Sequence, residues 1–214
     1  MIGAVSKNSK DHGIDRYHDL DPQADQTQQL LKVYADWASD YDHDNDHALE
    51  TVSQPNTVAM LTRHCEAREL AVLDYGCGTG LVGLHLQKAG FPIFDGADIS
   101  PEMLEIAKKR GYGRLFLLGG DESLPSESYD VVLCVGVFTH GHLGTEGMNE
   151  LLRLTRRGGL ICFTVNEGVW QTGGFQDAIA TLQVEDQWVV LEQRLDHYMR
   201  KEGVHGWYVT ARKT

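Results

Sequence analysis

The sequence has few cysteines, no long hydrophobic run and few basic residues for its length. Its 214 residues include four cysteines (Cys65, Cys77, Cys134 and Cys162) with no paired spacing, so we expect reduced thiols in a cytoplasmic protein. No apolar run reaches 18 residues, so no membrane-spanning helix is expected. The first 30 residues are polar and lack an apolar core segment, which predicts that there is no signal peptide.

Basic side chains are outnumbered by acidic ones. There are 19 Lys and Arg residues and 31 Asp and Glu residues, a formal net charge of -12. A surface of this charge repels nucleic-acid phosphates and anionic lipid headgroups. Neither nucleic acid nor a membrane is therefore expected as a partner, and the sequence leaves a monomer and a homodimer equally open.

The composition, 42% hydrophobic and 23% charged, is that of a globular protein. Residues 1–26 are polar and aperiodic, which predicts a flexible N-terminal arm. Residues 27–69 are expected to form a helical lid, with helices over 27–39 and 56–69. The first of these has an apolar face with Tyr34 and Trp37, and Tyr41 continues the same three- and four-residue spacing.

Residues 70–214 alternate between short apolar runs and helical stretches. The pattern predicts strands at 70–75, 92–97, 114–118, 130–136, 160–165, 187–194 and 205–212, and helices at 80–89, 101–110, 145–156 and 174–184. Such alternation is typical of an α/β fold with a parallel sheet covered on both faces. The short connection before the last strand predicts that this strand returns antiparallel.

The strongest motif is VLDYGCGTGLVG, residues 72–83. A buried strand leads to Asp74, then to Gly76, Gly78 and Gly80, and then into a helix. Glycines at such a turn allow positive φ angles and a close approach of the backbone to a ligand. Gly78, Gly80 and Gly83 also satisfy the dinucleotide pattern G-x-G-x-x-G. The carboxylate of Asp74 favours a ligand with an ammonium and a sulfonium group over a pyrophosphate.

Two further acids follow strands. Asp98 ends the second strand, 20 residues after Gly78, where an acid is expected to bind ribose hydroxyls. Ser100 and Pro101 next to it are typical of a helix N-cap and first helical position. Asp121 follows the third strand and could accept a hydrogen bond from an exocyclic amine, or cap a turn.

Together these motifs resemble those of the class I S-adenosylmethionine-dependent methyltransferases, over about residues 34–166. The run VGVFTHGHLG and the segment after it resemble the methyltransferase-like protein of the Williams-Beuren syndrome region and its bacterial relatives. The resemblance implies a Rossmann-like fold with a seven-stranded, mostly parallel sheet, and S-adenosylmethionine as cofactor, with S-adenosylhomocysteine as product. The residues that it implies for cofactor binding are Tyr34, Trp37, Tyr41, Asp74, Gly76, Cys77, Gly78, Gly80, Leu81, Asp98, Ile99, Met103, Gly120, Asp121, Glu122 and Val135.

The methyl acceptor is expected to be a small molecule. Its pocket is predicted to include Phe138, Asn166 and Trp170. His140 and His142, after the fourth strand, are the candidate general bases, because a neutral imidazole can accept a proton near pH 7. They could equally be loop residues, since many methyl transfers need no base.

Three alternative functions remain open. The chain could be a non-catalytic module that binds the cofactor, a nicotinamide-dependent reductase, or a DNA or protein methyltransferase. The last is disfavoured because Val135-Gly136-Val137-Phe138 stands where amino-methylating DNA enzymes carry a Pro-Pro motif. A metal site is not expected, although acids and histidines gather between residues 40 and 47.

Overall fold

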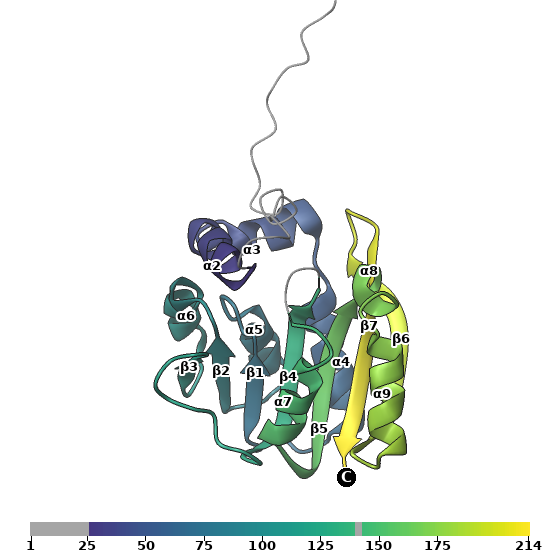
Figure 1. Cartoon of the computed structure of the whole chain (residues 1–214). Helices are drawn as coiled ribbons and strands as arrows, with labels where there is room; N and C mark the ends of the chain where they lie inside the picture. The colour runs from purple at the N-terminus through teal and green to yellow at the C-terminus, as the bar shows by residue number, and fades with distance from the viewer. Residues whose placement is uncertain (1–25, 140–142) are drawn as a thin grey trace, which may run out of the picture.

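The computed structural model describes residues 26–139 and 143–214, and its centre is a seven-stranded sheet (Figure 1). The strand order is β3-β2-β1-β4-β5-β7-β6. Only β7 runs antiparallel to its neighbours β5 and β6, as the sequence predicted. The strands are β1 (Val72–Tyr75), β2 (Phe94–Asp98), β3 (Leu115–Leu117), β4 (Tyr129–Phe138), β5 (Thr155–Asn166), β6 (Trp188–Met199) and β7 (Val204–Lys213).

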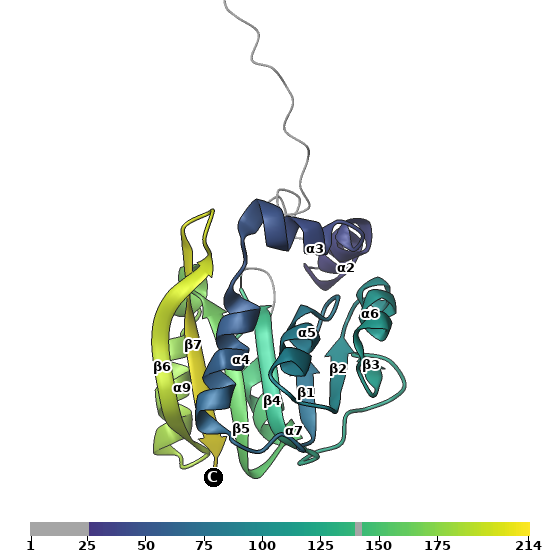
Figure 2. The same cartoon turned by 180° about the vertical axis from the view of Figure 1, so that it is seen from behind.

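Helices cover both faces of the sheet. Helices α4 and α5 lie on one face, and α7 and α9 lie on the other (Figures 1 and 2). The helices are α2 (Gln26–Trp37), α3 (Tyr41–His43), η1 (Asp44–Leu49), α4 (Ser53–His64), α5 (Leu81–Lys88), α6 (Pro101–Ala107), η2 (Lys108–Arg110), α7 (Gly147–Leu154), α8 (Glu167–Trp170) and α9 (Phe175–Val184). In the described part of the chain no helix is both long and apolar enough to cross a membrane.

Each face of the sheet has its own hydrophobic cluster. Phe163 and Trp188 belong to the larger cluster, on the side of α7 and α9. Leu61 of α4 packs with Leu133 and Cys162 on the other side. All four residues of β1 are buried, which is why that strand reads as a continuous apolar run around one aspartate.

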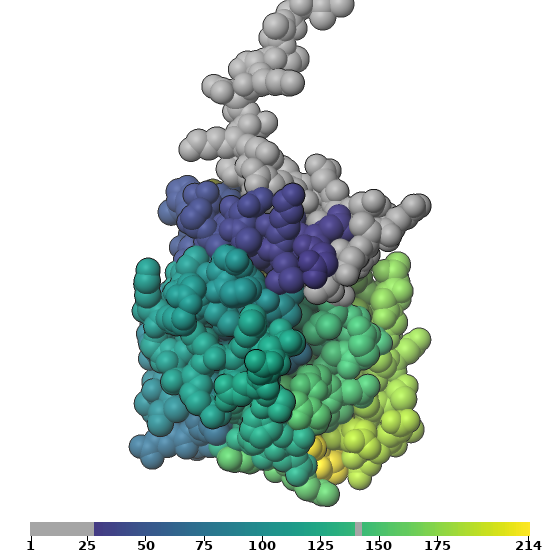
Figure 3. Space-filling model, turned by 60° about the vertical axis from the view of Figure 1, so that its left-hand side comes forward, coloured from purple at the N-terminus to yellow at the C-terminus, as the bar shows by residue number. Residues whose placement is uncertain are grey.

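Helices α2 and α3 lie above the carboxyl ends of the parallel strands, where the space-filling view shows them as a layer over the α/β body (Figure 3). The expected division at residues 26 and 69 stays a prediction, and residues 1–25 lie outside the described part. Helix α4, which the sequence placed in the lid, packs into the sheet's helical layer through Val58 and Leu61. The layer above the sheet edge therefore ends before α4.

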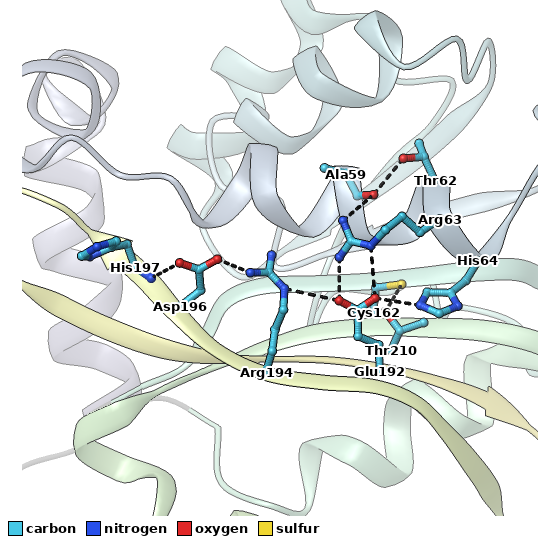
Figure 4. A network of polar contacts seen from close by, with 10 residues as sticks. All are labelled: Ala59, Thr62, Arg63, His64, Cys162, Glu192, Arg194, Asp196, His197 and Thr210. Carbon is cyan, nitrogen blue, oxygen red and sulfur yellow. Dashed lines mark hydrogen bonds and ion pairs between the residues drawn. The ribbon is translucent and has the colours of Figure 1, made fainter.

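The edge strand β6 is tied to α4 by a polar network (Figure 4). Arg63 donates to Glu192 Oε1 at 2.6 Å, and His64 Nε2 lies 2.8 Å from Glu192 Oε2. Arg194 pairs with Glu192 at 3.4 Å and also with Asp196. Burial opposes ionisation of Glu192, but the hydrogen bonds from Arg63 and His64 lower its pKa below the usual value.

Candidate functional site

A cavity of about 530 Å³ lies between the lid helices and the carboxyl edge of the sheet. It sits where the strand order changes direction between β1 and β4, the place where open α/β sheets bind ligands. Its lining residues are Leu30, Tyr34, Tyr41, Tyr75, Gly76, Gly78, Asp98, Ile99, Met103, Leu118, Gly119, Val135, Gly136, Val137, Leu143 and Glu146.

The glycine loop forms the floor of the cavity next to β1. Gly76 and Gly78 line it, and both have positive φ, 76° and 53°. A Cβ on Gly76 would lie 2.2 Å from Cγ2 of Val137, so no larger residue fits there. The loop is fixed by Ala97 of β2, whose carbonyl accepts the N–H groups of Gly76 and Cys77 at 2.7 and 3.0 Å.

Asp98 is the best-placed acid of the cavity. Its Oδ2 accepts the N–H of Gly78 at 2.8 Å, and its Oδ1 accepts the N–H of Ser100 at 2.9 Å. Burial raises its pKa, although these backbone hydrogen bonds oppose the rise. Ser100 caps α6 by accepting the N–H of Met103 at 3.2 Å, as the sequence predicted. The cap and the loop together hold the carboxyl group of Asp98 at the cavity.

The lid contributes Leu30, Tyr34 and Tyr41 to the cavity wall. Trp37, expected beside them, is buried behind them. Its Nε1 donates to Asp44 Oδ2 at 2.8 Å, and its ring meets that of Tyr41 edge-on at 4.7 Å. Trp37 therefore shapes the lid and does not line the cavity.

Asp42 joins the lid to the glycine loop, a contact that the sequence analysis missed. Its Oδ1 accepts from the hydroxyl of Thr79 at 2.6 Å, and its Oδ2 forms an ion pair with Arg110. We call these three side chains the latch. The sequence interpretation had placed Asp42 among the acids of residues 40–47, and nothing in the local pattern indicates a partner 68 residues away.

Asp74 is buried beneath the loop and does not line the cavity. It is 1% exposed, and its Oδ2 accepts from the hydroxyl of Tyr112 at 2.6 Å. Burial raises its pKa to about 7, against the opposing hydrogen bond from Tyr112. Asp74 is therefore not among the residues that line this cavity, and its expected contact with the ligand stays a prediction.

Other expected cofactor residues also lie outside the lining. Asp121 and Glu122 are exposed, and Leu118 and Gly119, immediately before them in the chain, line the cavity. The full set of expected residues outside the lining is Trp37, Asp74, Cys77, Gly80, Leu81, Gly120, Asp121 and Glu122. Those inside it are Tyr34, Tyr41, Gly76, Gly78, Asp98, Ile99, Met103 and Val135.

The three expected acceptor residues are outside the cavity lining and make structural contacts, and their acceptor role stays a prediction. Phe138 is buried against Phe163, with ring centroids 5.6 Å apart. Asn166 caps α8 by accepting the N–H of Gly168 at 2.9 Å. Trp170 is buried and stacks on Trp207 at 4.6 Å. His140 and His142 lie outside the described residues, so their role stays a sequence prediction.

The lining residues that the sequence analysis did not assign to the site come mostly from the ends of strands and the loops after them. Gly136 and Val137 lie near the end of β4, and Leu143 and Glu146 precede α7. The remaining unnamed lining residues are Leu30, Tyr75, Leu118 and Gly119. The one sequence signal for these lining residues is that they lie close in the chain to the motif residues. Among the described residues no group of three or more His, Cys, Asp or Glu side chains is arranged to hold a metal ion.

The site thus combines a strand–glycine loop–helix turn, an acid at the end of β2 and a cavity covered by the lid. Residues 73–163 match the family model described as a methyltransferase domain. Over this part the chain is similar to the class I S-adenosylmethionine-dependent methyltransferases.

Among curated proteins, human methyltransferase-like protein 27 is 39% identical over 142 residues, which cover 64% of this chain and 57% of that protein. The malonyl-[acyl-carrier protein] O-methyltransferase of Pectobacterium atrosepticum is 31% identical over 54% of this chain and 45% of its own. The chain thus spans about half the length of the curated relatives that it matches most strongly.

Solved structures show the same fold. The 1,6-didemethyltoxoflavin-N1-methyltransferase of Burkholderia thailandensis superposes with a TM-score of 0.61 at 20% identity, over 91% of this chain and 93% of its own. The magnesium protoporphyrin IX methyltransferase of Synechocystis gives a TM-score of 0.59, also at 20% identity, over 95% and 92%. At these identities the likeness shows the fold alone.

Proposed function

We propose that this chain binds S-adenosylmethionine in the cavity beneath the lid and transfers its methyl group to a small-molecule acceptor. One observation carries the proposal. The cavity is roofed by the lid, and its described lining includes the carboxyl groups of Asp98 and Glu146 without any Lys, Arg or His. Such a site suits a small ligand that carries positive charge.

The same charges distinguish this cofactor from a nicotinamide dinucleotide. Asp74 lies beneath the glycine loop and Asp98 lies at its side, so a pyrophosphate on the loop would meet two acids. An ammonium or sulfonium group would be attracted by them. The cavity therefore favours S-adenosylmethionine over the reductase alternative.

The lining suggests a place for each part of the cofactor. Asp98 would accept hydrogen bonds from the ribose hydroxyls, because it ends β2 at the cavity. The backbone of Gly76 and Gly78 would hold the methionine part. Ile99 and Met103 would pack on the adenine ring.

When bound, S-adenosylmethionine supplies a methyl group already activated by its sulfonium. The protein then needs to align the acceptor and exclude water, and alignment can contribute roughly 7–11 kcal/mol. Tyr34 and Tyr41 of the lid provide the cover. His140 and His142 remain the candidate bases for an acceptor that starts protonated.

The lid also favours a small acceptor over a macromolecule. Asp42 ties it to Thr79 and Arg110, and Leu30, Tyr34 and Tyr41 of the lid line the cavity. The net charge of -12 adds repulsion for nucleic acid. The names of relatives indicate varied acceptors, among them malonyl-[acyl-carrier protein] and ribosomal protein L11.

A labelling experiment tests the acceptor class. The protein is incubated with methyl-labelled S-adenosylmethionine and a cell extract separated into small molecules, protein and nucleic acid. The label should enter the small-molecule fraction, and an Asp98→Ala variant should transfer none. Label confined to the protein or nucleic-acid fraction would refute a small acceptor.

A further inference from the structure

Tyr112 forms a buried hydrogen-bonded pair with Asp74. The residue lies in the turn between η2 and β3, far in sequence from the glycine loop. Its hydroxyl donates to Asp74 Oδ2 at 2.6 Å and accepts the N–H of Gly83 at 3.2 Å. Within the described part of the chain, the buried Oδ1 of Asp74 has no hydrogen-bond partner. The phenol is thus the one side chain there that donates a hydrogen bond to this acid.

Three glycines make room for the Tyr112 ring. A Cβ on Gly80 would lie 2.7 Å from a ring carbon, and a Cβ on Gly83 or Gly96 would lie 2.8 Å from ring atoms. Real Cβ atoms do not approach this closely. The glycines come from the loop, from α5 and from β2, so three elements are shaped around one side chain. Two glycines of the G-x-G-x-x-G pattern are thereby explained without a dinucleotide.

The surroundings of Asp74 make its charge depend on this hydrogen bond. The titratable groups that act on it are Tyr112, Asp98, Cys77 and Cys134, and none of them is basic. Burial raises the pKa of Asp74 to about 7, the hydrogen bond from Tyr112 lowers it, and Asp98 raises it. Near neutral pH the ionised form of Asp74 is therefore maintained chiefly by the Tyr112 hydroxyl.

We propose that Tyr112 is a positioning residue that keeps Asp74 a carboxylate beneath the glycine loop, where its charge attracts the ammonium group of the bound cofactor. Asp74 stands two residues before Gly76, whose backbone lines the cavity. Because Asp74 is buried, its attraction to an opposite charge is stronger than it would be in solvent. The inference rests on the proposed function, since it assigns a task to the cofactor's methionine part.

Two ligands distinguish this electrostatic role of Tyr112 from a purely structural role in supporting the glycine loop. S-adenosylhomocysteine carries the ammonium group, whereas 5′-methylthioadenosine keeps the adenosine and lacks the amino-acid part. Calorimetric titrations between pH 6 and 8 compare the wild type with Tyr112→Phe. Tyr129→Phe is the matched control, because Tyr129 also donates to an aspartate, Asp95 at 3.0 Å, but at the start of β4, away from the cavity.

In the wild type, the affinity for S-adenosylhomocysteine should fall as the pH drops below about 7. Tyr112→Phe should weaken that affinity about tenfold at pH 7 and move the decline upward by about one pH unit. It should leave the affinity for 5′-methylthioadenosine within about twofold. Tyr129→Phe should change neither ligand.

Asp74→Asn gives an independent arm if Tyr112→Phe does not fold. It should bind S-adenosylhomocysteine weakly and without the pH dependence, and bind 5′-methylthioadenosine normally. An equal loss for both ligands, or an unchanged pH profile in Tyr112→Phe, would overturn the inference. Failure of the wild type to bind either ligand would instead refute the proposed function.

Discussion

Asp98 holds its place at the cavity through two backbone N–H groups, those of Gly78 and Ser100. Its proposed partners are the ribose hydroxyls. Hydrogen bonds to a charged group contribute about 1.5–3 kcal/mol each. Asp98→Ala should therefore weaken the binding of S-adenosylhomocysteine by at least about tenfold, measured by calorimetry. Wild-type affinity in a variant with unchanged far-ultraviolet circular dichroism would refute the role of Asp98.

Ionisation of the buried Asp74 should lower the free energy of unfolding above neutral pH. Burial raises its pKa from 3.8 to about 7, so between these values the folded state keeps a proton that the unfolded state releases. Stability from this group therefore falls as the pH rises from about 4 to about 7, and the cost is complete above that range. Asp74→Asn removes the charge, so its melting temperature relative to wild type should be higher at pH 8 than at pH 4.5. An identical difference at both pH values would contradict a raised pKa.

The latch connects the lid to the α/β body through a single lid side chain. Asp42→Asn removes the charge that pairs with Arg110 and weakens the contact with Thr79. Truncating a partly buried ion pair acts mainly on dissociation. Stopped-flow measurement should therefore show S-adenosylhomocysteine leaving about tenfold faster. Asp40→Asn, the same change at an exposed lid position, should leave the rate unchanged, and equal rates in both variants would contradict the latch.

The network between α4 and β6 stabilises the edge of the sheet. Glu192→Gln removes the charge that faces Arg63, His64 and Arg194. Networks of partly exposed ion pairs contribute about 1 kcal/mol to stability, so the melting temperature of the variant at pH 7 should be about 2–4 °C lower than that of the wild type. Glu105→Gln, which breaks the exposed pair with Lys108, should shift the midpoint far less. Equal shifts in the two variants would show that the network adds nothing to a single surface pair.

The pH dependence of that network has a definite sign. The pKa of Glu192 is lowered in the folded protein because hydrogen bonds from Arg63 and His64 outweigh burial. Its contribution is therefore present above the usual carboxyl pKa and is lost as the pH falls through the lowered value. The difference between wild type and Glu192→Gln should accordingly shrink in acid.

At the scale of the whole molecule, the alternation of strands and helices could be predicted from the sequence. Buried strands followed by helices predicted the parallel sheet, and the short turn before the last strand predicted the reversal of β7. Acids and glycines at strand ends meet at one sheet edge, and Asp98, Gly76 and Gly78 line the cavity there. Local periodicity and strand-end position carry this information.

Contacts that depend on tertiary packing could not be predicted from the sequence. The strand predicted to end at Gly136 continues to Phe138, with a register shift between Cys134 and Phe138. The irregularity accompanies the burial of Phe138 in the core, away from the acceptor position expected for it. Likewise, Tyr112 meets Asp74 only once the turn before β3 folds under the loop.

The central claim is that the cavity binds S-adenosylmethionine. Calorimetric titration of the purified wild type with S-adenosylmethionine, S-adenosylhomocysteine and NADH tests it most directly. Both adenosyl ligands should bind at one site per chain, and NADH should not bind, because the loop is flanked by Asp74 and Asp98. Binding of NADH alone would contradict the claim and leave both acids beside the loop without an explanation.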